Sequence, residues 1–167
     1  MLPIFVILRV MILGIDPGLA HCGWAIIKPN GDSNQLVSCG CVETKKGEDF
    51  AKRLAQIYNQ IKELCRRYKI EELAVESIFF AKNMKTAINI AQVIGTVKVA
   101  AQNSKTTVFE YTPLQVKMAI SGYGRADKKQ ITKMIGESLE KKEVIGNNHA
   151  ADAAAIALTH IFTSLAG

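Results

Sequence analysis

Apolar residues in the first quarter of the chain occur in short runs that stop at turn-forming residues. Residues 11–16 form one run, which ends at a Pro-Gly pair, and residues 21–28 form a second, which ends at a turn over residues 29–32. A third run covers residues 35–43. Short apolar runs bounded by Gly, Pro and Asn are typical of strands, and short connections favour antiparallel neighbours. The pattern therefore predicts a meander of three antiparallel strands.

The apolar positions that follow have the period of an amphipathic helix over residues 48–68, with Lys, Arg and Gln on the opposite face. Residues 72–76 and 107–111 are again short apolar runs, and a helix is expected between them over residues 85–103. A strand–helix–strand unit normally forms a right-handed parallel crossover. The pattern therefore adds a fourth and a fifth strand to the sheet through crossover helices.

Three more helices are expected after the fifth strand. Thr112-Pro113 is typical of an N-cap and first helical residue, residues 127–140 form a second amphipathic segment, and an Ala-rich helix runs from residue 146 to about residue 164. Small side chains let that last helix press closely on a sheet. The element order predicts an α/β fold with a mixed five-stranded sheet and helices on both faces, which is the ribonuclease H-like architecture.

The composition of the chain limits the classes of partner that can be expected. The chain has 167 residues, with 21 Lys and Arg against 15 Asp and Glu, and a net charge of +6. A basic balance suits a polyanion such as nucleic acid, although charge alone is a weak signal. No apolar run reaches the roughly 18 residues that span a bilayer, so no membrane partner and a cytoplasmic location are expected.

Residues 1–10 are apolar and precede a second methionine, Met11. They lack the basic start, longer apolar core and cleavage site of a signal peptide. We interpret them as an upstream-start extension, with a single domain over residues 11–167; a short extra strand is the alternative. The four cysteines form no C-x-x-C pair, and reduced thiols are expected.

Two acidic residues stand at the ends of predicted strands. Asp16 ends the first strand and Glu76 ends the fourth, and these strands should be neighbours. Carboxylates on adjacent strand ends repel each other unless a cation lies between them. Asp16 could instead cap the turn that follows it, and Gly-Ile-Asp-Pro-Gly also resembles the phosphate hairpin of actin-like ATPases. Glu76 could be a solvated strand end.

The start of the last helix carries His149 and Asp152, which share one helix face because they are three residues apart. Asp152 could serve as a cap and His149 as a surface residue, but a charged group among alanines needs a partner. His160, farther along, is expected to be a packed or surface residue. Carboxylates with one imidazole suit Mg²⁺ or Mn²⁺, and two such ions can clamp a phosphodiester.

The chain resembles the RuvC family of bacterial Holliday-junction resolvases from about residue 11 to residue 160. The set of matching stretches is specific, although no single one is. They are ILGIDPG at 12–18, VESIFFAKNMKTAINIAQVIG at 75–95, YTPLQVK at 111–117, GYGRADKKQI at 122–131 and ADAAAIALTH at 151–160. The resemblance implies a ribonuclease H-like homodimer that nicks a four-way junction symmetrically and leaves 5′-phosphate and 3′-hydroxyl ends. It also implies two Mg²⁺ ions per site, with Mn²⁺ as a substitute, and the RuvA–RuvB branch-migration complex as a partner.

The resemblance assigns roles to individual residues of this chain. The family's acidic residues map onto Asp16, Glu76 and Asp152, and its fourth site residue, Asp in many members, is His149 here, as metal ligand, base or both. Phe79 resembles an aromatic residue that wedges into the junction and stacks on a base. The expected phosphate contacts are Lys82, Asn83, Lys117, Arg125, Lys128 and Lys129. The helix from residue 85 resembles the dimer helix, with surplus apolar residues at Ala87, Ile90, Ala91, Ile94 and Val97.

Three other functions compete with this hypothesis. An actin-like phosphotransferase needs two large lobes, and this chain is too short for them. A junction-binding protein without catalysis would differ in leaving junctions uncut. A ribonuclease H-like enzyme that acts on RNA would show competition by RNA hybrids.

Overall fold

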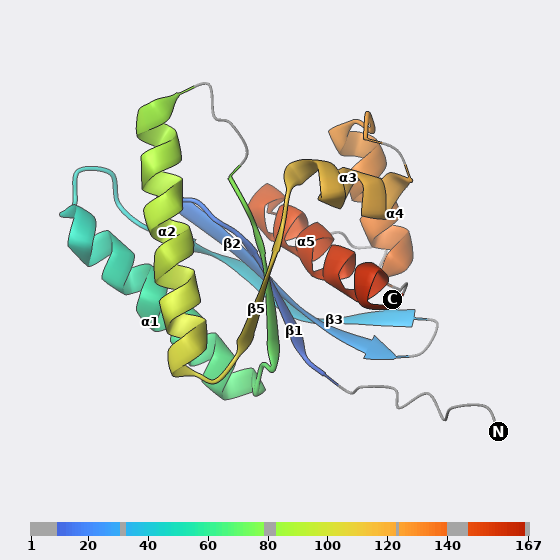
Figure 1. The fold of residues 1–167 in the computed structure, drawn as a ribbon, viewed down its shortest axis with the longest axis horizontal. Helices are drawn as coiled ribbons and strands as arrows, with labels where there is room; N and C mark the ends of the chain where they lie inside the picture. Colours follow the sequence, from blue (N-terminus) through green and yellow to red (C-terminus); the bar gives the residue numbers. More distant parts are fainter. Residues whose placement is uncertain (1–9, 31–32, 79–82, 123, 140–146, 166–167) are drawn as a thin grey trace.

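The sheet and helices predicted from the sequence are present in the computed structural model, which describes residues 10–30, 33–78, 83–122, 124–139 and 147–165 (Figure 1). Residues 1–9 of the expected N-terminal extension therefore lie outside the described residues, whereas its last residue, Val10, packs in the core. The strands are β1 (Ile12–Asp16), β2 (His21–Asn30), β3 (Ser33–Glu43), β4 (Glu72–Glu76) and β5 (Thr107–Tyr111). The helices are α1 (Phe50–Tyr68), α2 (Met84–Asn103), α3 (Pro113–Ser121), α4 (Lys128–Ser138) and α5 (Asn148–Leu165).

The strands form one mixed sheet in the order β3-β2-β1-β4-β5. β2 pairs antiparallel with both β1 and β3, and β4 pairs parallel with both β1 and β5. The apolar strand β1 is therefore central, as its composition predicts, and it lies beside β4. The carboxyl ends of β1, β4 and β5 meet at one edge of the sheet, where Glu76 pairs with Tyr111.

Helices cover both faces of this sheet, which confirms the predicted ribonuclease H-like layering (Figure 1). α1 and α2 pack on one face around Leu13, Ile15 and Leu73. α3, α4 and α5 pack on the other, around Ala25, Ile27 and Ala74. Thr112 caps α3 with Pro113 as its first residue, as predicted. The candidate metal ligands therefore lie on elements that are packed into the core on the two faces of the sheet.

Helix α5 lies unusually close to β1 and β2 because glycines face it. A Cβ added at Gly14 would overlap the carbonyl oxygen of Ala153 and lie 2.8 Å from the Ala157 Cβ, and one added at Gly23 would lie 2.9 Å from the His149 Cβ. Packing at this density leaves no room for even one more methyl group. The Ala-rich sequence therefore does press the helix on the sheet, and it carries His149 toward the strand ends.

Two sequence predictions need correction. The turn expected over residues 29–32 is narrower, because Pro29 and Asn30 still pair with β3. Pro29 lies beyond Ile27, where the pairing of β2 with β1 ends, so its missing N–H costs no bond on that side.

The surplus apolar surface of α2 also differs from the predicted set. Ile94 and Val97 are buried in the core, and only Ala91 of that set is fully on the surface. The exposed large apolar side chains of α2 are Met84, Ile88 and Val99, which are 77 %, 54 % and 54 % exposed. The hydrophobic stripe predicted for a partner therefore exists, but on other residues of the same helix.

In the described part of the chain, no helix combines the length and apolar character that a membrane crossing needs. All four cysteines are free, as predicted.

Candidate metal centre

Asp16 stands at the carboxyl end of the central strand β1, and only 19 % of its side chain is exposed. Burial raises the pKa of this carboxyl above its ordinary value, and the charge of Asp152 acts in the same direction. A hydrogen bond with His149 opposes the rise. The carboxylate is therefore held in a partly desolvated place where its negative charge is poorly compensated.

Glu76 ends β4, the parallel neighbour of β1. Burial raises the pKa of its carboxyl to about 7, and the charges of Asp16 and Asp152 add to that rise. Lys117 acts in the opposite direction. Two adjacent strand ends thus hold acids whose ionisation together is unfavourable, and a nearby cation would ease it.

Helix α5 supplies the other members from its first two turns. His149 Nδ1 lies 3.0 Å from Asp16 Oδ2, so this ring nitrogen can donate a hydrogen bond to the carboxylate. The donor atoms of Asp16, His149 and Asp152 all lie within 4.8 Å of one another. Glu76 lies outside this group of three but lines the same hollow, of about 380 Å³, with Asp16 and Asp152.

The donor set fits a hard divalent cation. The 3.0 Å separation of His149 Nδ1 and Asp16 Oδ2 is that of a hydrogen bond, so the ring nitrogen that a cation could bind is Nε2. Carboxylate oxygens suit Mg²⁺ or Mn²⁺, and an imidazole is a better ligand for the second of these. A cation here would also offset the charges of Asp16 and Asp152, which add to the effect of burial in raising the pKa of Glu76.

Two of the predicted phosphate-binding lysines stand in this hollow. Lys128, the first residue of α4, places its Nζ 3.2 Å from Asp152 Oδ2, and Lys117 on α3 is a second lining residue. Both side chains are exposed. The hollow therefore combines acids that can bind a cation with bases that can neutralise a phosphate.

Of the remaining predicted DNA contacts, those among the described residues do not line the hollow that contains the acids. Arg125 and Lys129 are exposed near the start of α4. Asn83 is the N-cap of α2, where its side-chain oxygen accepts from the backbone N–H groups of Lys85 and Thr86. Phe79 and Lys82 lie outside the described residues.

Sequence reasoning assigned no function to two histidines, His160 and His21, that make contacts with other side chains in the structure. His160, 2 % exposed, contacts the Tyr111 hydroxyl through Nδ1 at 2.6 Å and Glu72 through Nε2 at 2.8 Å. His21, at the start of β2, stacks on His149 with ring centroids 5.2 Å apart and planes 10° from parallel. These contacts join helix α5 to strands far away in the chain, so no local pattern of residues indicates them.

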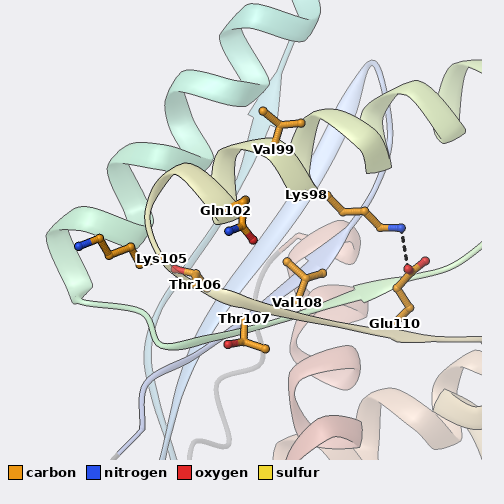
Figure 2. A pocket seen from close by; sticks show the side chains of 8 residues that line it. All are labelled: Lys98, Val99, Gln102, Lys105, Thr106, Thr107, Val108 and Glu110. Atoms are coloured by element: carbon orange, nitrogen blue, oxygen red, sulfur yellow. Dashed lines mark ion pairs between the residues drawn. The ribbon is translucent and has the colours of Figure 1, made fainter.

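A second hollow, of about 750 Å³, lies between α2 and the edge strand β5 and contains none of the candidate ligands. Figure 2 shows that Lys98 reaches across it to Glu110, at an Nζ–Oε1 distance of 2.6 Å. Val99, one of the exposed apolar residues of α2, also lines it. This hollow continues the apolar stripe of α2 and is separate from the acids.

The family model described as "Crossover junction endodeoxyribonuclease RuvC" matches residues 12–160. A crossover junction endodeoxyribonuclease RuvC from Pelotomaculum thermopropionicum is 43 % identical over 150 residues, which are 90 % of this chain and 92 % of the relative. The structure of Thermus thermophilus RuvC superposes with a TM-score of 0.89 at 34 % identity, covering 95 % of this chain and 97 % of the other. The same TM-score and identity are found for T. thermophilus RuvC in complex with a Holliday junction substrate, over 93 % of this chain and 94 % of the other.

Proposed function

The chain belongs to the RuvC family of crossover junction endodeoxyribonucleases, and on this premise we propose that Asp16, Glu76, His149 and Asp152 form the metal centre with which it resolves Holliday junctions. It is a DNA nuclease of recombination and repair, and it acts on junction DNA with a divalent metal. The finer assignments below, of residues, metal and assembly, are parts of the proposal.

One observation carries the assignment of the site. Asp16, His149 and Asp152 converge from β1 and α5 to within 4.8 Å, and Glu76 faces the same hollow with a pKa raised to about 7. Uncompensated acids in a concave site are costly to stability, and a bound cation offsets that cost. As structural caps these residues would have no reason to converge.

We propose two Mg²⁺ ions per site, replaceable by Mn²⁺. Bound there, divalent ions supply Lewis acidity that activates a water and stabilises the leaving 3′-oxygen. Asp16 orients the His149 ring by accepting a hydrogen bond from Nδ1. The lone pair of Nε2 is then free to bind a metal ion or to accept a proton. We assign the neutralisation of the scissile phosphate to Lys117 and Lys128, because both line this hollow; cleavage would leave 5′-phosphate and 3′-hydroxyl ends.

Phosphate contacts along the junction arms are proposed for the rest of the basic group. Arg125 and Lys129 extend the positive surface from the hollow along the start of α4. Each phosphate that these side chains neutralise adds about one unit to the salt dependence of binding. The full proposed set is Lys82, Asn83, Lys117, Arg125, Lys128 and Lys129, with Phe79 as the base-stacking wedge.

We propose that the protein acts as a homodimer through α2. Met84, Ile88 and Val99 leave an apolar stripe exposed on this helix, and a Cβ added at Gly95 would meet nothing within 4 Å. A second copy covering the stripe would remove this surface from water and place two sites on one junction, as paired symmetric nicks require. Cooperation with a RuvA–RuvB branch-migration complex is proposed from family membership alone.

The test is incubation of a mobile four-way junction with the protein and Mg²⁺ or Mn²⁺. Wild-type protein should produce paired nicks. Asp16→Asn should abolish cutting while junction binding, measured by gel shift in EDTA, stays intact, because the amide cannot compensate the cation charge. Normal cutting by Asp16→Asn would exclude this metal site, and cutting of RNA hybrids in preference to junctions would exclude this substrate.

A further inference from the structure

A second group of metal-binding side chains lies outside the acidic centre, on the outer part of the sheet. His21 at the start of β2 is directly opposite Glu43 at the end of β3. Cys41 stands two residues before Glu43, so its side chain points to the same face of the sheet. The donor atoms of these three residues all lie within 4.8 Å of one another.

The strand register brings these side chains together beside the start of α5. Cys41 pairs with Gly23, and the space over Gly23 is filled by the backbone and Cβ of His149, so the thiol and the His21 ring both lie next to that helix. The His21 and Glu43 side chains are exposed, and the Cys41 thiol is half-buried. The thiol contacts the side chain of Asn147 and donates to the carbonyl oxygen of Val42 at 3.8 Å. A cation bound by the sulfur would replace the contact with Val42.

We propose that His21, Cys41 and Glu43 bind a borderline divalent cation, Zn²⁺, at a site distinct from the acidic centre. Imidazole, thiolate and carboxylate are the protein ligands of Zn²⁺, whereas Mg²⁺ avoids sulfur. With bonds of roughly 2.0–2.3 Å, ligands of one tetrahedral ion lie about 3.3–3.8 Å apart. The donor atoms here lie within 4.8 Å of one another, and rotation of the exposed His21 and Glu43 side chains would bring them to the shorter separations. A water molecule would be the fourth ligand.

Binding joins the end of β3 to β2 beside the nuclease centre. The Cys41 thiol gives up its proton to solvent when the Zn–S bond forms. Asn147 remains as an outer partner of the sulfur, a kind of contact that orients metal ligands. Because the His21 ring is stacked on His149, a cation on His21 fixes the ring against which His149 rests. The two sites therefore differ in metal preference but share a histidine pair.

Titration with Co²⁺, followed by optical absorption, tests the site without any measurement of cutting. A thiolate bound to Co²⁺ produces a charge-transfer band, which Zn²⁺ should bleach by displacement. The band should form with one ion per wild-type chain. It should also form in Asp16→Asn, where the acidic centre is disabled, and in the matched control Cys39→Ser, which removes a neighbouring thiol on the same strand.

The ligand variants should behave differently. Cys41→Ser should lose the band, and Glu43→Gln and His21→Asn, which keep the thiol, should weaken Co²⁺ binding by about tenfold or more. Circular dichroism checks that each variant is folded. Absence of the band in folded wild-type protein, its persistence in Cys41→Ser, or its loss in Asp16→Asn would overturn the proposal. The first two outcomes deny this thiol site, and the third assigns the ion to the nuclease centre.

Discussion

Replacing Glu76 by Gln should stabilise the metal-free protein at alkaline pH while abolishing its activity. The pKa of Glu76 is raised from 4.5 to about 7, chiefly by burial and then by the charges of Asp16 and Asp152. A group with a raised folded-state pKa binds its proton more tightly in the folded than in the unfolded protein. Its contribution to stability is therefore present below pH 4.5 and is lost as the pH rises through 7.

The magnitude follows from the same values. A pKa of about 7 against 4.5 corresponds to roughly 3 kcal/mol, at about 1.4 kcal/mol per pKa unit. Solvent screening of the partly exposed carboxyl reduces this to about 1–2 kcal/mol. In EDTA, Glu76→Gln should exceed the wild type in free energy of unfolding by that amount at pH 8, and most of the difference should disappear by pH 5.

Urea unfolding at the two pH values measures this difference. Glu71→Gln, which removes an exposed carboxylate just before β4, is the matched control and should show no such dependence on pH. Added Mg²⁺ should stabilise the wild type more than Glu76→Gln, because binding to the folded state is linked to stability. An equal difference between the proteins at pH 5 and pH 8, or a less stable Glu76→Gln at pH 8, would refute the reasoning.

Three further substitutions test the surroundings of the site. His149→Ala should slow single-turnover junction cutting by about tenfold or more, since it removes a ligand or proton acceptor; a near-normal rate would return His149 to a surface role. Gly23→Ala should cost about 1–3 kcal/mol in urea unfolding and slow cutting, because the new methyl group displaces the α5 backbone at His149, and unchanged stability would contradict the close packing. His160→Ala should cost about 2–4 kcal/mol, because Tyr111 and Glu72 lose their partner; a loss below roughly 1 kcal/mol, the value of a single exposed contact, would show that this network adds little.

The sequence alone predicted the strands and helices because periodicity is a local property, and the rule for strand–helix–strand crossovers added the fourth and fifth strands to the sheet. Asp16 is an example: an apolar run that stops at Pro-Gly predicts a carboxylate at a central strand end, and β1 is central. Whether that carboxylate caps a turn or binds a cation depends on α5, more than a hundred residues later. The apolar pattern is compatible with both roles, and the contact with His149 at 3.0 Å favours cation binding over capping of the turn.

The contacts that the sequence did not reveal are those between distant elements. His160 lies in an apolar helical run, and nothing nearby in the chain indicates that its ring joins Glu72 to Tyr111. On α2, helical period alone could not decide which apolar residues face α1, and Ile94 and Val97 proved to be core rather than surplus. Such assignments depend on how elements rotate against one another, which hydrophobic pattern constrains only within about one residue position.

The close packing of α5 on β1 also governs when a newly made chain can become a nuclease. Asp16 is synthesised early, but His149 and Asp152 belong to the last helix, which reaches the sheet only through the gaps at Gly14 and Gly23. A growing polypeptide that ends before α5 lacks two of the four proposed metal ligands, whatever part of the sheet it has formed. On the proposed assignment, a chain interrupted before its final helix cannot cut DNA.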